Sequence, residues 1–257
     1  MSFQRIISLT PSITESIFAL GAEQRLTAVT DACDYPATAN RKPHVCSWFD
    51  PDIERIAKLQ PDLVLGLASA HGRLAEDVQK IGAECLLFNS ATIEEALDDM
   101  ARLATLLGMP ESGRALVNGL RQRLGLLDAK VRRLNDIPRL TVSRVLDISD
   151  EELIVAGPLS FQYDVIARAG GINITSSMAA AYPRVGFWQF TDWDPEVIFI
   201  CGSDPDYLRR LAAAPGWEAL RAVRSGRLYQ FDCGLTCRTG PRIVDMAELL
   251  FMTLYGQ

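Results

Sequence analysis

The chain has 257 residues, of which 48% are hydrophobic, and a formal net charge of −6. A chain of this length and apolar content can bury a sizeable core, which argues against an intrinsically disordered protein. The acidic balance argues against a nucleic-acid surface built on bulk basicity, and no apolar run approaches the ~18 residues of a membrane-spanning helix.

The first part of the chain alternates short apolar runs with helical patterns, which is typical of βα units and parallel sheets. Gly21 is expected to stop the first helix, because glycine readily adopts the left-handed conformation that ends helices. The predicted strands are residues 5–9, 26–30, 62–67 and 84–89, and the predicted helices are residues 11–21, 50–60, 73–82 and 92–108.

A long helix is expected next. From Glu111 to about Asn135, apolar residues recur at steps of three and four. They are Leu116, Leu120, Leu124, Leu127, Val131 and Leu134. The spacing predicts one continuous helix of roughly 25 residues, about 37 Å long at a rise of 1.5 Å per residue. Pro138 ends it, because proline removes a backbone donor and clashes inside a helix.

After Pro138 the alternation restarts, with runs such as "RLTVSRVLD", "ELIVAG" and "EVIFICG" before a final helix in "GPRIVDMAELLFMTLYG". We therefore predict an α/β protein of two small βα lobes joined by one long rigid helix. The N-terminal lobe would span residues 1–110, the connecting helix 111–136 and the C-terminal lobe 137–257. A single doubly wound domain that contains the long helix is the alternative.

Several blocks of the sequence, in the same order, resemble the cobalamin/iron-siderophore substrate-binding protein family. The blocks are "RIISLTPSITESIFALG", "DYP", "DPDIERIAKLQPDLVLG", "GPLSFQYDVIARAGGINI" and "GPRIVDMAELL". "DYP" followed by Trp48 just before "IERI" is the pattern of the cobalamin-binding branch. The resemblance implies the helical-backbone metal receptor fold, a ligand cleft between the lobes, delivery of the ligand to an ABC permease, and neither catalysis nor a required cofactor.

Four aromatic residues match cleft positions of the family. They are Tyr35 and Trp48 in the first lobe and Phe161 and Trp188 in the second, with Phe187 and Trp193 in reserve. Tyr35 follows a predicted strand, and ligands of open α/β sheets bind outside the carboxyl ends of strands. Flat aromatic side chains can bury the apolar face of a corrin at low entropic cost. The alternative is that these aromatic residues pack the contact between the lobes.

Arg238 and Arg242 flank "TGP" at the start of the last helix. The resemblance places one of them at the edge of the cleft, where a guanidinium could bind a carboxylate or the amide-rich rim of a corrin. For Arg242, hydrogen bonding to loop carbonyls is an equally good interpretation.

The six cysteines are too few for a disulfide scaffold. Cys85 and Cys201 lie in apolar strand-like runs and are predicted to be buried thiols of the core. The other four fall in loops expected to face the cleft; they are Cys33, Cys46, Cys233 and Cys237.

Cys33, Cys46 and Cys237, with His44 two residues before Cys46, offer the sulfur and nitrogen ligands that suit Zn or another soft metal. Three interpretations of the loop cysteines compete: free cytosolic thiols, a thiol that coordinates the cobalt or another metal of the ligand, and a redox pair. A lowered thiol pKa is expected near Arg238, because a nearby cation favours the thiolate.

The sequence also bears on location and partners. The first residues lead directly into "IISL", which is too short for the apolar region of a signal peptide. This predicts a cytoplasmic protein, or a periplasmic or extracellular one if the chain begins after a removed signal.

In the family, an acidic residue on each lobe pairs with arginines of the permease, and Glu54 matches the first. The helix that would carry the second, after Trp188, is expected to be missing or very short, so the second would be one of Asp192, Asp194 and Glu196.

The preferred function is thus a binding protein for a corrinoid, with haem or a siderophore as other ligand classes and no nucleic-acid partner. The chain has no GxGxxG, Walker or GxSxG pattern and only two histidines, His44 and His71. The alternative is a cytosolic metal- or thiol-dependent corrinoid-handling protein or enzyme that uses Cys33, Cys46 and Cys237.

Overall fold

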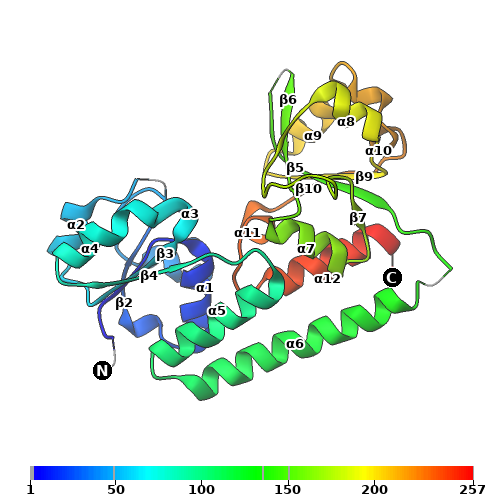
Figure 1. The fold of residues 1–257 in the computed structure, drawn as a ribbon. Helices are drawn as coiled ribbons and strands as arrows, with labels where there is room; N and C mark the ends of the chain where they lie inside the picture. The colour runs from blue at the N-terminus through cyan, green and yellow to red at the C-terminus, as the bar shows by residue number, and fades with distance from the viewer. Residues whose placement is uncertain (1–2, 49, 135, 150, 257) are drawn as a thin grey trace. The chain divides into compact units, whose positions relative to one another are not determined.

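The structure is a computed structural model, which describes residues 3–48, 50–134, 136–149 and 151–256. The chain divides into two compact units (Figure 1). Unit 1 comprises Met1–Ser90, Glu94–Arg121 and Arg238–Pro241, and unit 2 comprises Ala91–Ile93, Gln122–Cys237 and Arg242–Gln257. Each unit has its own sheet and its own hydrophobic core, so the predicted two-part α/β organisation is confirmed.

Unit 1 is built on a four-stranded parallel sheet with the strand order β2-β1-β3-β4. The strands are β1 (Ile6–Ser8), β2 (Leu26–Val29), β3 (Leu63–Leu67) and β4 (Glu84–Phe88). The helices are α1 (Pro11–Leu20), α2 (Ile53–Lys58), α3 (Ala68–His71), α4 (Ala75–Lys80) and α5 (Ile93–Leu106), with short 3₁₀ turns at η1 (Glu23–Arg25), η2 (Ala39–Arg41) and η3 (Gly72–Leu74).

The local sequence explains where α1 begins and ends. Pro11 occupies the first helical position, where its missing N–H costs no helical hydrogen bond. Gly21 ends the helix with φ 77°, and its N–H donates to Phe18 O at 3.0 Å, as predicted. Behind α1, Ile6 and Leu65 are fully buried, so the strand ends are held by a packed core.

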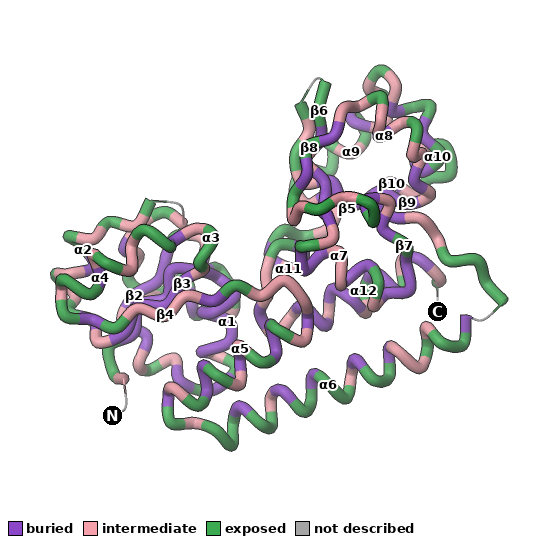
Figure 2. The backbone as a smooth tube through the Cα atoms, viewed as in Figure 1, coloured by how far each residue is buried: buried purple, intermediate pink, exposed green. Residues whose placement is uncertain are grey.

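The predicted long helix is α6 (Pro110–Arg132), which has 23 residues and a length of about 35 Å. Leu120, Leu124 and Leu127 are buried on its apolar face, and buried and exposed residues alternate along it in Figure 2. The helix supplies residues up to Arg121 to unit 1 and the rest to unit 2. Asn135, the expected end of the helix, lies outside the described residues.

Unit 2 contains a mixed sheet in the order β10-β9-β5-β6-β8, with β7 paired to β5. The strands are β5 (Thr141–Ile148), β6 (Glu152–Val155), β7 (Ile172–Asn173), β8 (Arg184–Gly186), β9 (Val197–Cys201) and β10 (Leu228–Phe231). The helices are α7 (Phe161–Arg168), α8 (Phe187–Trp193), α9 (Pro205–Ala212), α10 (Arg221–Arg224), α11 (Cys233–Thr236) and α12 (Ile243–Tyr255), with a 3₁₀ turn η4 (Trp217–Ala219). The pairs β5–β6 and β6–β8 are antiparallel, a departure from pure βα alternation.

The prediction that the helix near Trp188 is missing or very short agrees with the structure. Helix α8 has seven residues, and Asp194 ends it in the left-handed conformation with φ 39°. The helix is held by tertiary contacts, because Phe187 and Phe190 lie 5.8 Å and 6.0 Å from the ring of Trp217 in the core of unit 2. Among the described residues, none of the helices combines the length and apolarity needed to span a bilayer.

Candidate ligand-binding site

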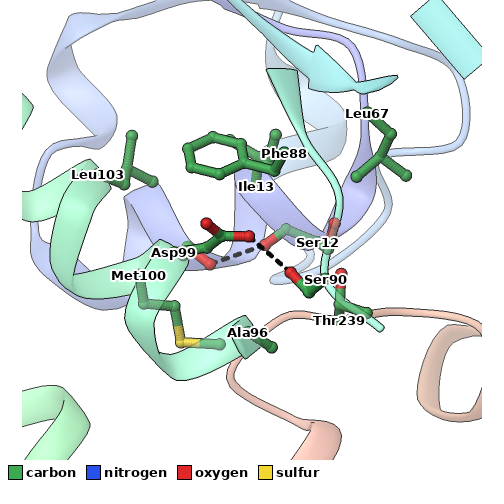
Figure 3. Close-up of a pocket in the computed structure, with 11 residues that line it drawn as sticks. Ser12, Ile13, Leu67, Phe88, Ser90, Ala96, Asp99, Met100, Leu103 and Thr239 are labelled. Carbon is green, nitrogen blue, oxygen red and sulfur yellow. Dashed lines mark hydrogen bonds between the residues drawn. The ribbon is translucent and has the colours of Figure 1, made fainter. Parts of the chain in front are cut away.

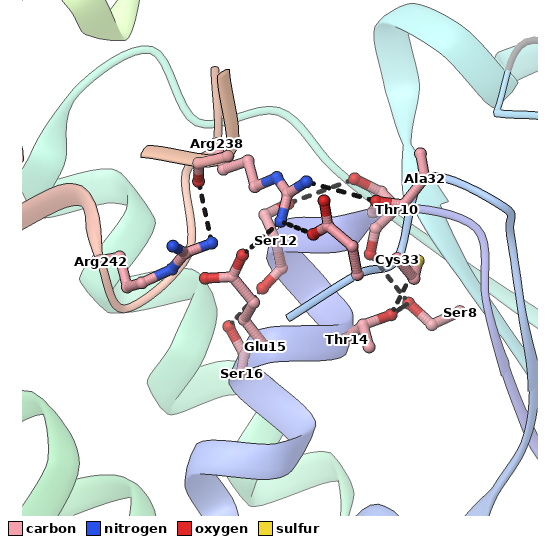
Figure 4. A network of polar contacts seen from close by, with 12 residues as sticks. Ser8, Thr10, Ser12, Thr14, Glu15, Ser16, Ala32, Cys33, Arg238 and Arg242 are labelled. Carbon is pink, nitrogen blue, oxygen red and sulfur yellow. Dashed lines mark hydrogen bonds and ion pairs between the residues drawn. The ribbon is translucent and has the colours of Figure 1, made fainter. Parts of the chain in front are cut away.

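The carboxyl ends of β1 and β2 carry a buried polar cluster in unit 1 (Figure 4). Thr14 Oγ1 donates to Ser8 Oγ at 2.9 Å and to Cys33 Sγ at 3.2 Å, and Thr30 Oγ1 lies 3.3 Å from the same sulfur. Ser8, Thr14, Thr30 and Cys33 are all fully buried. These contacts fix the loop after β2 on α1, because each buried hydroxyl has found a partner.

Arg238 adds a charged contact to the same loop. Its Nη1 donates to Glu15 Oε1 at 2.9 Å and to Asp34 Oδ1 at 2.7 Å, and its Nη2 donates to Ala32 O at 3.3 Å (Figure 4). The Arg238 side chain is only 11% exposed and that of Glu15 only 2%. The guanidinium therefore neutralises a buried carboxylate and holds the residues that precede Tyr35.

Tyr35 itself is 47% exposed, and its peptide bond to Pro36 is cis. Trp48 is half-buried, and its segment is held by His71, whose Nε2 lies 2.9 Å from Trp48 O. Leu67 N donates to His71 Nδ1 at 3.0 Å, so Nε2 carries the proton and donates to the carbonyl. Burial lowers the pKa of His71 and keeps the ring neutral. Sequence reasoning missed this role, although a histidine four residues after a buried strand is a signal for it.

Unit 2 presents its aromatic residues differently. Phe161 is 9% exposed at the start of α7, where Ser160 Oγ accepts from Tyr163 N at 3.3 Å and caps the helix. Trp188 is 77% exposed on α8, and its indole lies over Gly186. The reserve residues Phe187 and Trp193 pack against the core cluster of unit 2.

Tyr182 was missed by sequence reasoning. It is 44% exposed, and its hydroxyl donates to Gln162 Oε1 at 3.1 Å beside the first turn of α7. The signal was present, because Tyr182–Pro183 repeats the aromatic–proline pair of Tyr35–Pro36. Each unit thus carries one exposed tyrosine directly before a proline.

Arg242 lies at the start of α12, where its Nη2 donates to Gly234 O at 3.0 Å. This contact agrees with the interpretation of Arg242 as a residue that binds loop carbonyls.

The small cavity in unit 1 between α1 and α5 does not suit a large ligand (Figure 3). It measures about 20 Å³, enough for a water molecule beside Asp99, whereas ligand pockets typically measure about 300–1,000 Å³.

The expectations for the cysteines need correction. Cys33 is fully buried, and burial raises its pKa even though hydrogen bonds and Arg238 act in the opposite direction. Burial also raises the pKa of Cys46, to about 11. The prediction of a lowered thiol pKa beside Arg238 is therefore wrong for Cys33, because desolvation outweighs the field of an arginine already paired with two carboxylates.

A metal at Cys33, Cys46 and Cys237 is not supported either. Within the described part of the chain, no group of three or more His, Cys, Asp or Glu residues is placed to hold a metal ion. The sulfur of Cys237 instead contacts Cys201, at 3.5 Å. Cys85 and Cys201 are both partly exposed, so the prediction that they are buried thiols of the core is wrong.

Comparison with known proteins agrees with this architecture. Residues 6–233 match the model of a family described as Periplasmic binding protein. The chain belongs to this family. The vitamin B12-binding protein of Yersinia pestis (strain Pestoides F) is 29% identical to it over 201 residues, which are 78% of this chain and 70% of the relative.

Two solved structures extend the likeness to the whole fold. The periplasmic vitamin B12 binding protein BtuF of Vibrio cholerae superposes with a TM-score of 0.82 at 26% identity, over 98% of this chain and 96% of that one. A periplasmic heme binding protein from Pseudomonas aeruginosa superposes with a TM-score of 0.89 at 25% identity, over 99% and 94%.

The family membership settles three expectations. The protein is a substrate-binding protein of the ABC-transporter type, and the enzyme alternative is excluded because the family consists of transport components without catalytic activity. The expectation of a cytoplasmic protein is wrong, since the members of this family are periplasmic. The interpretation of the loop cysteines as free cytosolic thiols depended on that location and therefore loses its support.

Proposed function

We propose that this binding protein carries a corrinoid of the cobalamin type. The observation that carries the proposal is that each unit exposes aromatic surface in segments that follow or adjoin the strand ends, with Tyr35 in unit 1 and Tyr182 and Trp188 in unit 2. Such side chains bury the apolar face of a flat macrocycle at low entropic cost. The vitamin B12-binding relatives support a corrinoid over other flat ligands.

The proposed contacts come from residues of both units. Tyr35 and Trp48 would contact the ligand from unit 1, and Phe161 and Trp188 from unit 2. The amide-rich rim of a corrin would accept hydrogen bonds from Arg242, whereas Arg238 would position the Tyr35 loop through Glu15 and Asp34.

We retain the lobe boundaries as part of this proposal. Residues 1–110 and 137–257 would form the two ligand-contacting lobes, and residues 111–136 would connect them. Helix α6 supports this organisation, because one uninterrupted helix supplies residues to each compact unit.

Titration calorimetry and visible absorption with cobalamin, cobinamide, haem and a ferric hydroxamate test the proposal. We expect the two corrinoids to bind, and Trp48→Ala to weaken their binding by at least ~1 kcal/mol, about fivefold. Tyr207→Ala is the matched control, since Tyr207 is 37% exposed on α9, outside the proposed contacts. Binding of haem or the hydroxamate in place of corrinoids would overturn the assignment of the ligand.

Delivery of the ligand to an ABC permease is the second part of the proposal. Glu54 is exposed in the first turn of α2 and Asp192 is exposed on α8. Asp194 and Glu196 are engaged inside unit 2, because they accept hydrogen bonds from Arg221 N at 2.7 Å and Thr141 N at 2.8 Å. Glu54 and Asp192 are therefore the acidic residues that we propose for contact with arginines of the permease.

A further inference from the structure

Three cysteines of unit 2 meet where β9 ends. Cys201 is the last residue of β9, Cys233 begins α11, and Cys237 follows the last residue of α11. The thiol of Cys237 donates to Cys201 Sγ at 3.5 Å, and Cys233 also interacts with Cys201. Cys201 is partly exposed and the other two are exposed, so small reagents can reach the cluster from solvent.

A buried arginine points at these sulfurs. Arg144 lies in β5 and is 1% exposed, and its Nη2 donates to Cys237 Sγ at 3.5 Å. Its Nη1 donates to Val145 O, its guanidinium lies 5.7 Å from the ring of Phe199, and its Nε has no hydrogen-bond partner among the described residues.

The positive charge of the buried Arg144 requires a nearby negative charge to offset it. In the described part of the chain, Arg144 forms no ion pair with a carboxylate, although buried arginines are almost always paired. Among its contacts with Val145 O, the Phe199 ring and Cys237, only the sulfur cluster can ionise, and a thiolate there would supply the missing negative charge.

The two sulfurs differ in acidity. The hydrogen bond from Cys237 lowers the pKa of Cys201 to about 7, against the opposing effect of burial, and the charge of Arg144 acts in the same direction. The same hydrogen bond, together with burial, raises the pKa of Cys237. Cys201 is thus the nucleophile of the pair, and Cys237 stays protonated beside it.

We propose that Cys201 and Cys237 form a redox-active dithiol that exchanges with low-molecular-mass disulfides. The Cys201 thiolate attacks one sulfur of a disulfide RSSR, which forms a mixed disulfide and releases RS⁻. Cys237 then gives its proton to the released RS⁻ or to water, and its sulfur attacks the sulfur of Cys201, which forms the Cys201–Cys237 disulfide and releases the second RS⁻. The two electrons of the dithiol thereby reduce RSSR to two thiols.

Arg144 shifts the equilibrium of this exchange toward the reduced dithiol. Oxidation removes the thiolate that offsets the charge of Arg144, so the reduced form is favoured relative to an ordinary structural disulfide. The members of the family are periplasmic, and the bacterial periplasm is a compartment in which disulfides form and persist. The pair would therefore respond to redox conditions and would not serve as a permanent cross-link.

Glutathione disulfide, added to the reduced full-length protein, tests the proposal by mass spectrometry and peptide mapping. We expect the wild-type protein to lose two thiols and to yield a peptide pair joined through Cys201 and Cys237, reversed by dithiothreitol. Cys237→Ser should stop at one glutathione adduct on Cys201, and Cys201→Ser should form no fast adduct. Cys85→Ser is the control and should behave like the wild-type protein.

The rate of alkylation against pH tests the role of Arg144. Cys201 should react at least about tenfold faster than Cys85 at pH 7, because its thiolate fraction is larger. Arg144→Met should slow Cys201 and move the midpoint of its profile upward, whereas Arg144→Lys should keep part of the rate, with circular dichroism as the check on folding. Equal rates for Cys201 and Cys85, or a disulfide that joins Cys233 to Cys237, would overturn the proposal.

Discussion

Arg238 of unit 1 and Arg144 of unit 2 are both largely buried beside cysteines, but they have different partners. Arg238 pairs with Glu15 and Asp34, at 2.9 Å and 2.7 Å, and its charge is offset by carboxylates. Arg144 pairs with no carboxylate among the described residues and contacts Cys237. The pKa of Cys33 is raised, whereas near Arg144 the pKa of Cys201 is lowered and that of Cys237 is raised.

A cysteine close to an arginine is therefore not by itself a reactive thiol. Near Arg238 desolvation raises the pKa of Cys33 and outweighs the opposing effects of its hydrogen bonds and of the guanidinium, so Cys33 stays protonated. Near Arg144 the thiol has a donor in Cys237 and a cation without another anion, so ionisation is favoured. What separates the two thiols is first the hydrogen bond that Cys201 accepts from Cys237 and the weight of desolvation at Cys33, with the arginine charge as a lesser cause.

The largest effect is expected at Arg238. Arg238→Ala removes the cation from the buried carboxylate of Glu15, and we expect a loss of about 3 kcal/mol in the free energy of unfolding, measured in urea. Glu15→Gln in the same chain should restore part of the loss, because the buried charge is then gone.

Arg209→Ala is the matched control for this loss. Arg209 and Asp206 pair at 2.8 Å, but their side chains are 80% and 60% exposed. An exposed pair contributes at most about 1 kcal/mol, so this variant should stay close to the wild-type protein. A similar loss in both variants would contradict the contrast between buried and exposed arginines.

Much of the fold could be predicted from periodicity and turn residues. The spacing of Leu120, Leu124 and Leu127 at steps of three and four predicted α6, and Gly21 predicted where α1 ends. Helix α8 could not be found in this way, because its seven residues are stabilised by the packing of Phe190 against Trp217, a contact between distant segments.

The site was harder to predict, because burial of a loop residue depends on what covers it. Cys33 follows a strand and looked exposed, yet Thr14 of α1 covers it. Cys201 looked buried in an apolar run, but it is the last residue of β9 and is partly exposed. The usable signal was Arg144, the one charged residue inside "TVSRVL", since an arginine in a buried strand requires an anionic partner.

The next largest effect is expected on the free energy of unfolding of unit 1 as the pH falls below 7. The pKa of His71 is lowered from 6.5 in the folded protein, so the unfolded chain binds a proton first as the pH falls. Stability is then fully present above pH 6.5 and declines below it, by at most about 1.4 kcal/mol per pH unit. His71→Asn should remove this part of the slope in urea unfolding series between pH 7 and pH 5. An unchanged slope would show that His71 is not the group that titrates.

A smaller effect on the free energy of unfolding is expected for unit 2, and it falls above pH 7. The pKa of Cys201 is lowered from 9.0 to about 7, so the unfolded chain holds the proton in this interval and the folded protein gains stability as the pH rises. Because Cys201 is partly exposed, screening limits the gain to about 1 kcal/mol between pH 7 and pH 9. Unfolding under reducing conditions should show the gain in the wild-type protein, less of it in Arg144→Met and none in Cys201→Ser. The same gain in all three proteins would contradict the assignment.

The smallest effect on the folded protein is expected for the exposed carboxylates proposed for docking. Glu54→Gln and Asp192→Asn remove charges at exposed positions, so each should change the free energy of unfolding by no more than about 0.5 kcal/mol. Calorimetry should likewise give unchanged ligand affinity, because neither residue is among the proposed ligand contacts. Uptake by vesicles that contain the permease should fall in both variants, and further in the double variant, since each loses a charge-assisted contact with an arginine. Asp206→Asn on α9 is the control for a general effect of surface charge, and an equal loss of uptake in that variant would remove Glu54 and Asp192 as specific docking residues.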